Sequence, residues 1–153
     1  MGGTMKPVAV AAGEGRRLHI LGDNVTCKLD GQATGGAFAV FEVIVPPDGG
    51  PPPHIHHRED ETIFIVEGEI EFWVDGRTFA AKAGTWVFAP RGVPHRFHNR
   101  GIHEAKMMIM ATPAGLERFF EEMSREVPTM PPDMEKVIAL CAKQGIEILP
   151  PKA

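Results

Sequence analysis

The sequence from about residue 16 to 111 is a succession of short apolar or alternating segments separated by Gly, Pro and Asp. In the clearest of them, residues 70–74, every second residue is apolar, which gives a strand one buried and one exposed face. The dipeptides Glu67-Gly68 and Asp75-Gly76 bound this segment, and their glycines suit the positive φ of two-residue hairpins. The pattern predicts a three-stranded meander within an antiparallel all-β domain.

The same punctuation predicts further strands along the chain. They cover Arg17–Leu21, Asn24–Leu29, Ala37–Val45, Thr62–Val66, Thr85–Ala89, His95–Asn99 and Glu104–Ala111. About eight to ten short strands suit a closed barrel or a double-sheet jelly roll, because both architectures remove or protect exposed sheet edges.

Helical periodicity appears only after the predicted strands. Thr112-Pro113 resembles an N-cap followed by proline at the first helical position, and apolar residues then recur at helical spacing. The stripe is Leu116, Phe119, Phe120, Met123 and Val127. A second helix is predicted over Asp133–Gln144, ended by Gly145. We expect it to bury Met134, Val137, Ile138 and Cys141, and both stripes to pack on the barrel or on a second subunit.

Length and composition predict one domain over residues 1–153, with a barrel at about 16–111 and a helical extension at about 112–153. The net charge is -4 and no Lys/Arg-rich run occurs, which argues against nucleic acid as a partner and favours a small molecule. No apolar window approaches the ~20 residues that span a bilayer, so we expect no membrane partner and a cytoplasmic protein. Cys27 and Cys141 are far apart and predict isolated, buried thiols.

The stretch HIHHREDE, residues 54–61, has the spacing of a metal site. His54 and His56 are two residues apart, so on a strand both imidazoles leave the same face, while His57 points the other way. Glu61 lies an odd number of residues from His56, and it rejoins that face only if the intervening polar residues form a bend.

A second stretch, GTWVFAPRGVPHRFHN at residues 84–99, offers a further ligand. A turn signal at Pro90-Arg91-Gly92 precedes a strand on which His95 and Phe97 share one face, whereas Arg96 and His98 take the other. His95 is therefore placed as an inward histidine on a neighbouring strand.

These two stretches resemble the two motifs of the cupin superfamily. The first, G(X)5HXH(X)3–4E(X)6G, is matched by His54, His56, Glu61 and Gly68, but Asp48 stands at its leading glycine, with Gly49 and Gly50 just after it. The second motif, G(X)5PXG(X)2H(X)3N, is matched in full by Gly84, Pro90, Gly92, His95 and Asn99. The resemblance implies an all-β cupin jelly-roll barrel, here with short C-terminal helices.

The resemblance also implies that His54, His56, Glu61 and His95 bind one divalent metal inside the barrel. Three imidazoles and one carboxylate suit Fe, Mn, Ni, Co, Cu or Zn better than Ca or Mg. An octahedral ion would keep two positions open for chemistry, whereas a tetrahedral zinc would be closed and structural.

The single-domain format resembles small bacterial cupins described as quercetin-dioxygenase-like. That resemblance implies a metal-dependent dioxygenase acting on a small enolisable or aromatic, flavonol-like compound, with Glu61 as ligand and catalytic proton acceptor. The alternatives are a metal-dependent isomerase or decarboxylase of a small carbonyl compound, and a non-catalytic binding cupin. The absence of tyrosine excludes a tyrosyl acid or base. The resemblance further implies a homodimer, with outward Trp73 under the contact.

The remaining histidines, His19, His57, His98 and His103, are expected outside the metal cluster because of their strand parity or their turn positions. Candidates for an apolar wall around the metal are Phe64, Phe72, Phe88, Phe97 and Met108, although core packing explains them equally well.

Overall fold

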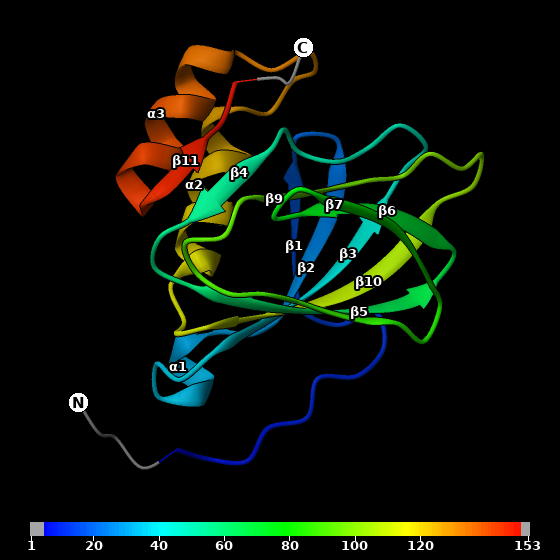
Figure 1. Cartoon of the computed structure of the whole chain (residues 1–153). Coiled ribbons are helices and arrows are strands. Elements are labelled where there is room, and N and C mark those ends of the chain that lie inside the picture. Colours follow the sequence, from blue (N-terminus) through cyan, green and yellow to red (C-terminus); the bar gives the residue numbers. More distant parts are fainter. Residues whose placement is uncertain (1–4, 151–153) are drawn as a thin grey trace.

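Two antiparallel sheets face each other in the computed structural model, which describes residues 5–150 (Figure 1). The six-stranded sheet has the order β1 (Arg16–Ile20), β2 (Asp23–Leu29), β3 (Ala39–Val45), β10 (Ala105–Thr112), β5 (Asp60–Glu67) and β8 (Trp86–Ala89). The five-stranded sheet has the order β11 (Ile146–Ile148), β4 (His54–His56), β9 (His95–His98), β6 (Glu69–Val74) and β7 (Arg77–Lys82). The helices are α1 (Gly31–Thr34), α2 (Leu116–Glu126) and α3 (Met134–Gln144). The predicted all-β jelly roll is confirmed.

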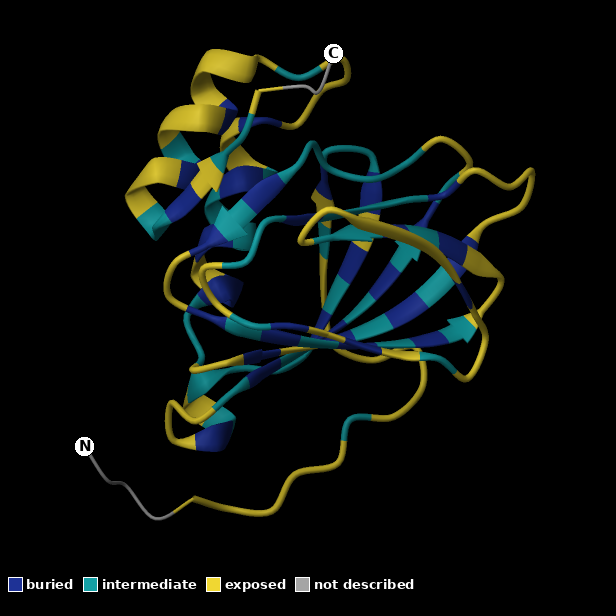
Figure 2. Cartoon of the chain, viewed as in Figure 1, coloured by how far each residue is buried: buried dark blue, intermediate teal, exposed yellow. Residues whose placement is uncertain are grey.

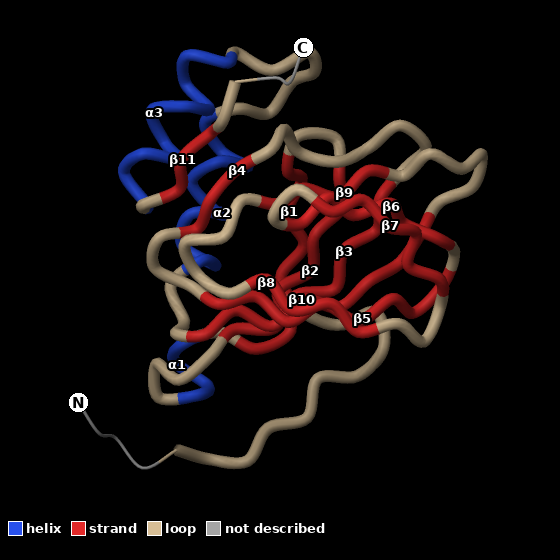
Figure 3. The backbone as a smooth tube through the Cα atoms, viewed as in Figure 1, coloured by secondary structure: helices blue, strands red, loops and turns tan. Residues whose placement is uncertain are grey.

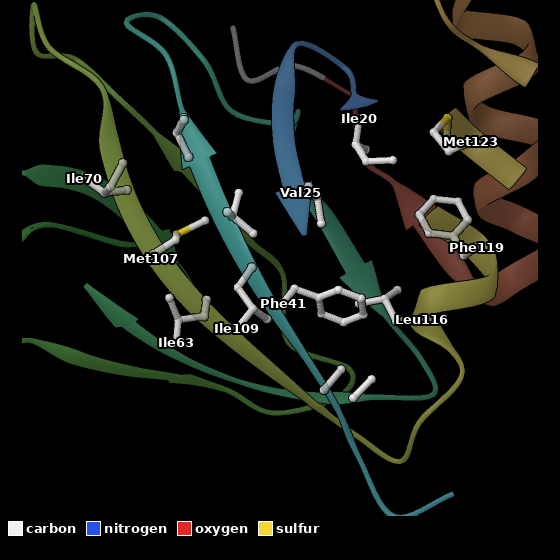
Figure 4. Packing of buried hydrophobic residues seen from close by; sticks show 14 of the residues in the cluster. Ile20, Val25, Phe41, Ile63, Ile70, Met107, Ile109, Leu116, Phe119 and Met123 are labelled. Carbon is white, nitrogen blue, oxygen red and sulfur yellow. The ribbon is translucent and has the colours of Figure 1, made fainter. Parts of the chain in front are cut away.

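The alternation in sequence becomes the core between the sheets. Along β3 every second side chain is buried, and the ring of its Phe41 packs edge-on against Phe120 of α2, with centroids 4.9 Å apart. The turns that flank β6 have positive φ at Gly68 (82°) and Gly76 (84°), as the hairpin dipeptides predicted. The apolar faces of the two sheets thus form the main core (Figure 4).

The helices α2 and α3 cover one end of the barrel, with their polar faces exposed (Figure 2). Leu116, Phe119 and Met123 of α2 are buried in the same cluster as Ile20 and Val25 of the first two strands (Figure 4). The apolar stripe predicted for the first helix therefore packs on the barrel.

The predicted start of that helix was wrong. Thr112 is the last residue of β10, where it pairs with Asp60 of β5, and α2 begins only at Leu116 after the N-cap Gly115. Sheet pairing, which the local Thr-Pro signal does not contain, extends the strand by one residue.

The second helix has the predicted ends, Asp133 as N-cap and Gly145 in the left-handed conformation at φ 80°. Val137 and Cys141 are buried as expected, but Met134 and Ile138 are 42 % and 50 % exposed. The helix α3 packs mainly on α2 and β11, so its buried stripe is narrower than its apolar pattern. Neither α1 nor β11, the strand that follows α3, was predicted from the sequence (Figure 3).

Several aromatic side chains that were candidates for the cavity lie elsewhere. Phe88 and Trp86 of β8 are 58 % and 68 % exposed, and Phe64 packs on Trp86 with ring centroids 4.6 Å apart. Phe72 belongs to the main core, and Met108 of β10 is on the outward face. Of the five candidates, Phe97 alone lines the cavity described below.

The homodimer expected from the family resemblance stays a prediction.

Both cysteines are buried free thiols, as the sequence predicted. Within residues 5–150, no helix has the length and apolar character needed to cross a membrane.

Candidate metal centre

Four side chains predicted from the two motifs meet inside the barrel, and we call them the His/Glu cluster: His54, His56, Glu61 and His95. They come from three strands, β4, β5 and β9, and one nitrogen or oxygen atom from each lies within 4.8 Å of the others. Every member is buried, with 3–7 % of its surface exposed. This spacing and burial place the cluster to hold one metal ion.

Strand geometry brings the cluster together. His54 and His56 share the inward face of β4, and His54 is the register partner of His95 on β9. The chain bends at residues 57–58, as predicted, and so brings Glu61 in from the opposite sheet. Outside the cluster, the Arg91 backbone and side chain bind the carboxylate of Asp60 at 2.9–3.2 Å, which ties the start of β5 to the turn before β9.

The donor set fits a metal because the far nitrogen of each histidine is already engaged. The Nδ1–H of His54 donates to the carbonyl oxygen of Pro52 at 2.8 Å, and that of His95 donates to Val93 at 3.0 Å. A carbonyl can only accept, so these contacts keep a proton on both Nδ1 atoms and turn the two Nε2 atoms toward the cluster, where they can bind an ion once they carry no proton.

Glu61 lies within hydrogen-bonding distance of two histidines of the cluster. Glu61 Oε1 lies 2.9 Å from His56 Nε2 and 3.1 Å from His95 Nε2. Burial alone would raise the pKa of Glu61, but the two imidazoles more than offset this and hold it well below its usual range. Burial likewise opposes the charged form of His56, yet Glu61 and Glu59 raise its pKa to about 10. Burial, together with His56 and His95, lowers the pKa of His54 to about 3. The cluster therefore combines an ionised carboxylate and an uncharged His54 with a charged His56, whose proton an incoming metal ion would displace.

One carboxylate that orients the cluster was missed by the sequence analysis. Glu59 is 2 % exposed, and its Oε2 accepts from Nδ1 of His56 at 3.4 Å. Its other oxygen accepts from Nε2 of Gln144, the last residue of α3, at 3.0 Å. The sequence shows Glu59 only as one charge in a polar run, and nothing local points to Gln144 as its partner. The carboxylate of Glu59 thus links the end of α3 to the imidazole of His56.

Replacing Glu59 with glutamine is expected to weaken metal binding about 10- to 100-fold, because carboxylates that orient ligand histidines contribute on that scale. Gln144→Ala should give a smaller loss in the same direction. Competition with a coloured chelator measures both. The matched control is Glu147→Gln, which removes the exposed partner of His57 and should leave affinity unchanged. Equal affinities for Glu59→Gln and the control would contradict the role of Glu59.

Asn99, the last residue of the second motif, holds neighbouring loops in place. Asn99 is buried, and its side-chain amide donates to Val45 and His103 while its oxygen accepts from Gly101.

The offset of the leading glycine in the first motif has a physical reason, because a Cβ at Gly50 would collide with the carbonyl oxygen of Phe97. The required glycine is therefore at 50 in this chain.

The remaining histidines lie outside the cluster, as strand parity predicted. His19, His57 and His103 are exposed, and His98 is half-buried beside Asp48, with its Nε2 3.3 Å from Oδ1.

The His/Glu cluster opens into an apolar cavity of about 90 Å³. Its wall comes from the barrel and also from α2, α3 and β11, which close it from the C-terminal side. The lining residues are Ile20, Leu21, Asp23, Val25, Val43, Pro51, Pro52, His54, His56, Glu61, Phe97, Ile109, Phe119, Phe120, Met123, Val137, Cys141, Ile146 and Ile148. The helical stripes, which were expected to pack on the barrel or on a second subunit and not to form a ligand site, thus also line this cavity.

Comparison with known proteins agrees with the fold and the cluster. The family model described as "Cupin domain" matches residues 41–111, which include all four cluster residues. This chain contains a cupin domain. Among solved structures, this cupin resembles KdgF from Halomonas sp. with a TM-score of 0.66 at 15 % identity, over 74 % of this chain and 99 % of the other. At that identity the likeness concerns the fold.

The relatives of this cupin are named for different activities. It is 28 % identical over 118 residues to quercetin 2,3-dioxygenase of Bacillus subtilis, covering 76 % of this chain and 34 % of that protein. It is 30 % identical over 82 residues to "Polyketide synthase CurC" of Streptomyces cyaneus, covering 54 % of this chain and 53 % of that protein. The polyketide cyclase RemF of Streptomyces resistomycificus has a TM-score of 0.56 at 27 % identity, over 71 % and 80 % of the two chains. The cupin thus spans about half or less of the curated relatives named here.

Proposed function

We propose that this cupin is a metal-dependent dioxygenase that acts on a small enolisable or aromatic compound. The observation that carries the proposal is the opening of a buried three-histidine, one-carboxylate cluster into an apolar cavity. A structural zinc site would need no such cavity, whereas a substrate that binds beside the ion requires one.

The size of the cavity narrows the substrate. Its volume of about 90 Å³ is well below the roughly 300–1,000 Å³ of pockets for drug-sized ligands. A compound with one ring or a short chain therefore suits the cavity better than a flavonol, which has three rings.

The protein residues have separate parts in the proposed reaction. His54, His56, Glu61 and His95 would hold the ion, which supplies Lewis acidity to the oxygens of an enol or hydroxyketone. Glu61 accepts the proton that the substrate hydroxyl loses, since its carboxylate is ionised and faces the cavity. Apolar residues of α2, α3 and β11 exclude water, which protects reactive intermediates from wasteful side reactions.

The comparisons support two versions of this chemistry. The likeness to quercetin 2,3-dioxygenase favours an oxygen-consuming reaction. The likeness to RemF and CurC, both associated by name with polyketides, favours a second candidate, a redox-neutral rearrangement or cyclisation of a carbonyl compound at the same ion. Both versions need a metal and an enolisable substrate.

Oxygen consumption tests the proposal. We would purify the protein without chelators or an affinity tag, measure its metal content, and follow oxygen uptake with one-ring enols and short hydroxyketones. We expect a near-stoichiometric Fe, Mn, Ni, Co or Cu content and uptake of one O₂ per substrate molecule. The metal-stripped protein serves as the control and should take up none.

Each other result has a defined meaning. Turnover of a carbonyl compound without oxygen uptake would replace the dioxygenase with the redox-neutral candidate. Stoichiometric zinc without turnover of any compound would contradict both and favour a structural site or a binding cupin.

A further inference from the structure

Asp23, at the start of β2, is a buried carboxyl group that the cluster does not use. It follows the tight turn Leu21-Gly22 between β1 and β2, and its side chain is 7 % exposed. Among the described residues, its Oδ1 has no hydrogen-bond partner. This atom faces the loop that leads to His54, since a Cβ at Gly49 would lie 3.0 Å from it. Buried polar atoms in proteins are almost always paired, so an unpaired one indicates an absent partner.

Asp23 lines the same cavity as the cluster. Three of the cluster residues line the cavity, and so does the weakly polar thiol of Cys141. Among the other described lining residues, Asp23 has the one polar side chain. In binding sites of this kind a few polar groups fix the orientation of an otherwise apolar ligand. Burial raises the pKa of Asp23 to about 7, so near neutral pH the group both donates and accepts hydrogen bonds.

We propose that Asp23 is the residue that orients the substrate, by a hydrogen bond between its carboxyl group and a second oxygen of the substrate beyond those at the metal. The inference rests on the proposed function, because it assumes a substrate that binds at the ion. It adds a chemical requirement: the substrate has a mainly apolar body with a hydroxyl or keto oxygen away from its metal-binding end. A compound without that oxygen leaves the carboxyl group unpaired, which costs affinity.

Two small hydroxamates test the inference directly. Glycolohydroxamate and propionohydroxamate have the same number of non-hydrogen atoms and the same metal-binding group, but the first has a hydroxyl where the second has a methyl. Each is titrated into the full chain loaded with Co²⁺, whose visible absorption reports ligand binding at the ion. We compare the ratio of the two dissociation constants among variants, so that any general change in affinity cancels.

We expect the wild-type protein to prefer glycolohydroxamate and Asp23→Leu to lose that preference by about tenfold, the scale of one buried hydrogen bond. Asp23→Asn, whose amide still donates and accepts, should keep most of it. Asp75→Asn, the same change in an exposed turn, is the matched control and should behave as wild type. If Asp23→Leu fails to fold, Asp23→Ala removes the carboxyl group without adding atoms and should give the same loss.

An unchanged ratio in Asp23→Leu or Asp23→Ala, with both hydroxamates bound, would overturn the role of Asp23 and leave the proposed function intact. If Asp23→Asn lost the preference for glycolohydroxamate as completely as Asp23→Leu does, the proposed hydrogen bond to the substrate would be overturned. Failure of both hydroxamates to bind the cobalt-loaded wild type would instead overturn the proposed function, and this inference with it.

Discussion

Replacing His95 with alanine is expected to abolish metal retention while the barrel stays folded. His95 is the cluster member supplied by β9, and it lies opposite His54 in the register. Structural zinc binds to zinc-finger peptides with about 10–16 kcal/mol, and an even share over four ligands gives about 3 kcal/mol for each, or roughly 100-fold in affinity. Elemental analysis after dialysis measures the loss, and circular dichroism checks the fold.

The matched control is His98→Ala, three residues further along the same strand and on its other face. Its imidazole is half-buried beside Asp48, away from the cluster, so metal content should stay at the wild-type level. Equal loss of metal in the two variants would contradict the assignment of His95 by strand parity.

The second large effect concerns stability without metal. The pKa of Asp23 is about 7 in the folded protein against an ordinary value of 3.8, because burial disfavours the charge. A raised pKa means that the folded state binds the proton more tightly than the unfolded chain does. The contribution of Asp23 to the free energy of unfolding is therefore fully present below about pH 4 and is lost as the pH rises toward 7. The difference between the two pKa values corresponds to up to about 4 kcal/mol.

Asp23→Asn removes this loss, so the variant should become more stable than wild type as the pH rises from 4 to 8, by up to about 4 kcal/mol. Urea unfolding of the chelator-treated proteins measures the difference at each pH. His54, His56, Glu61 and Cys141 line the same cavity and are common to both proteins, so their titration largely cancels in the comparison. Asp75→Asn should show no such trend. A difference that does not change with pH would contradict the raised pKa.

Strand parity predicted much of the cluster from sequence. Two residues of spacing placed His54 and His56 together, and the same rule separated His95 from His98. The fold followed from short alternating segments and from glycines at hairpin turns, all of them local signals. The structure brings the four predicted side chains together, and their role as metal ligands stays a prediction.

Other parts of the site depend on long-range packing that no local pattern encodes. The helical stripes in α2 and α3 indicated an apolar face, but the residues opposite that face are set by how the helices dock on the barrel. Asp23 stands beside a Gly in a hairpin, where aspartate is common for reasons of turn chemistry alone. Gln144 reaches Glu59 because α3 ends near the end of β4, where the backbone N–H of His57 donates to the carbonyl oxygen of Gly145.

The pairing of β11 with β4 sets the order in which the centre is completed during synthesis. The strand with His54 and His56 pairs with β9 at a single register position, and its full-length partner is β11. The two strands are held further by His57 and Glu147, which are 90 residues apart in the chain. A ribosome therefore releases the histidines of β4 long before it makes the strand that holds them in place. The finished end of the barrel, with β4 held between β9 and β11, therefore forms only after β11 has emerged, and an ion that needs this arrangement would bind late in maturation.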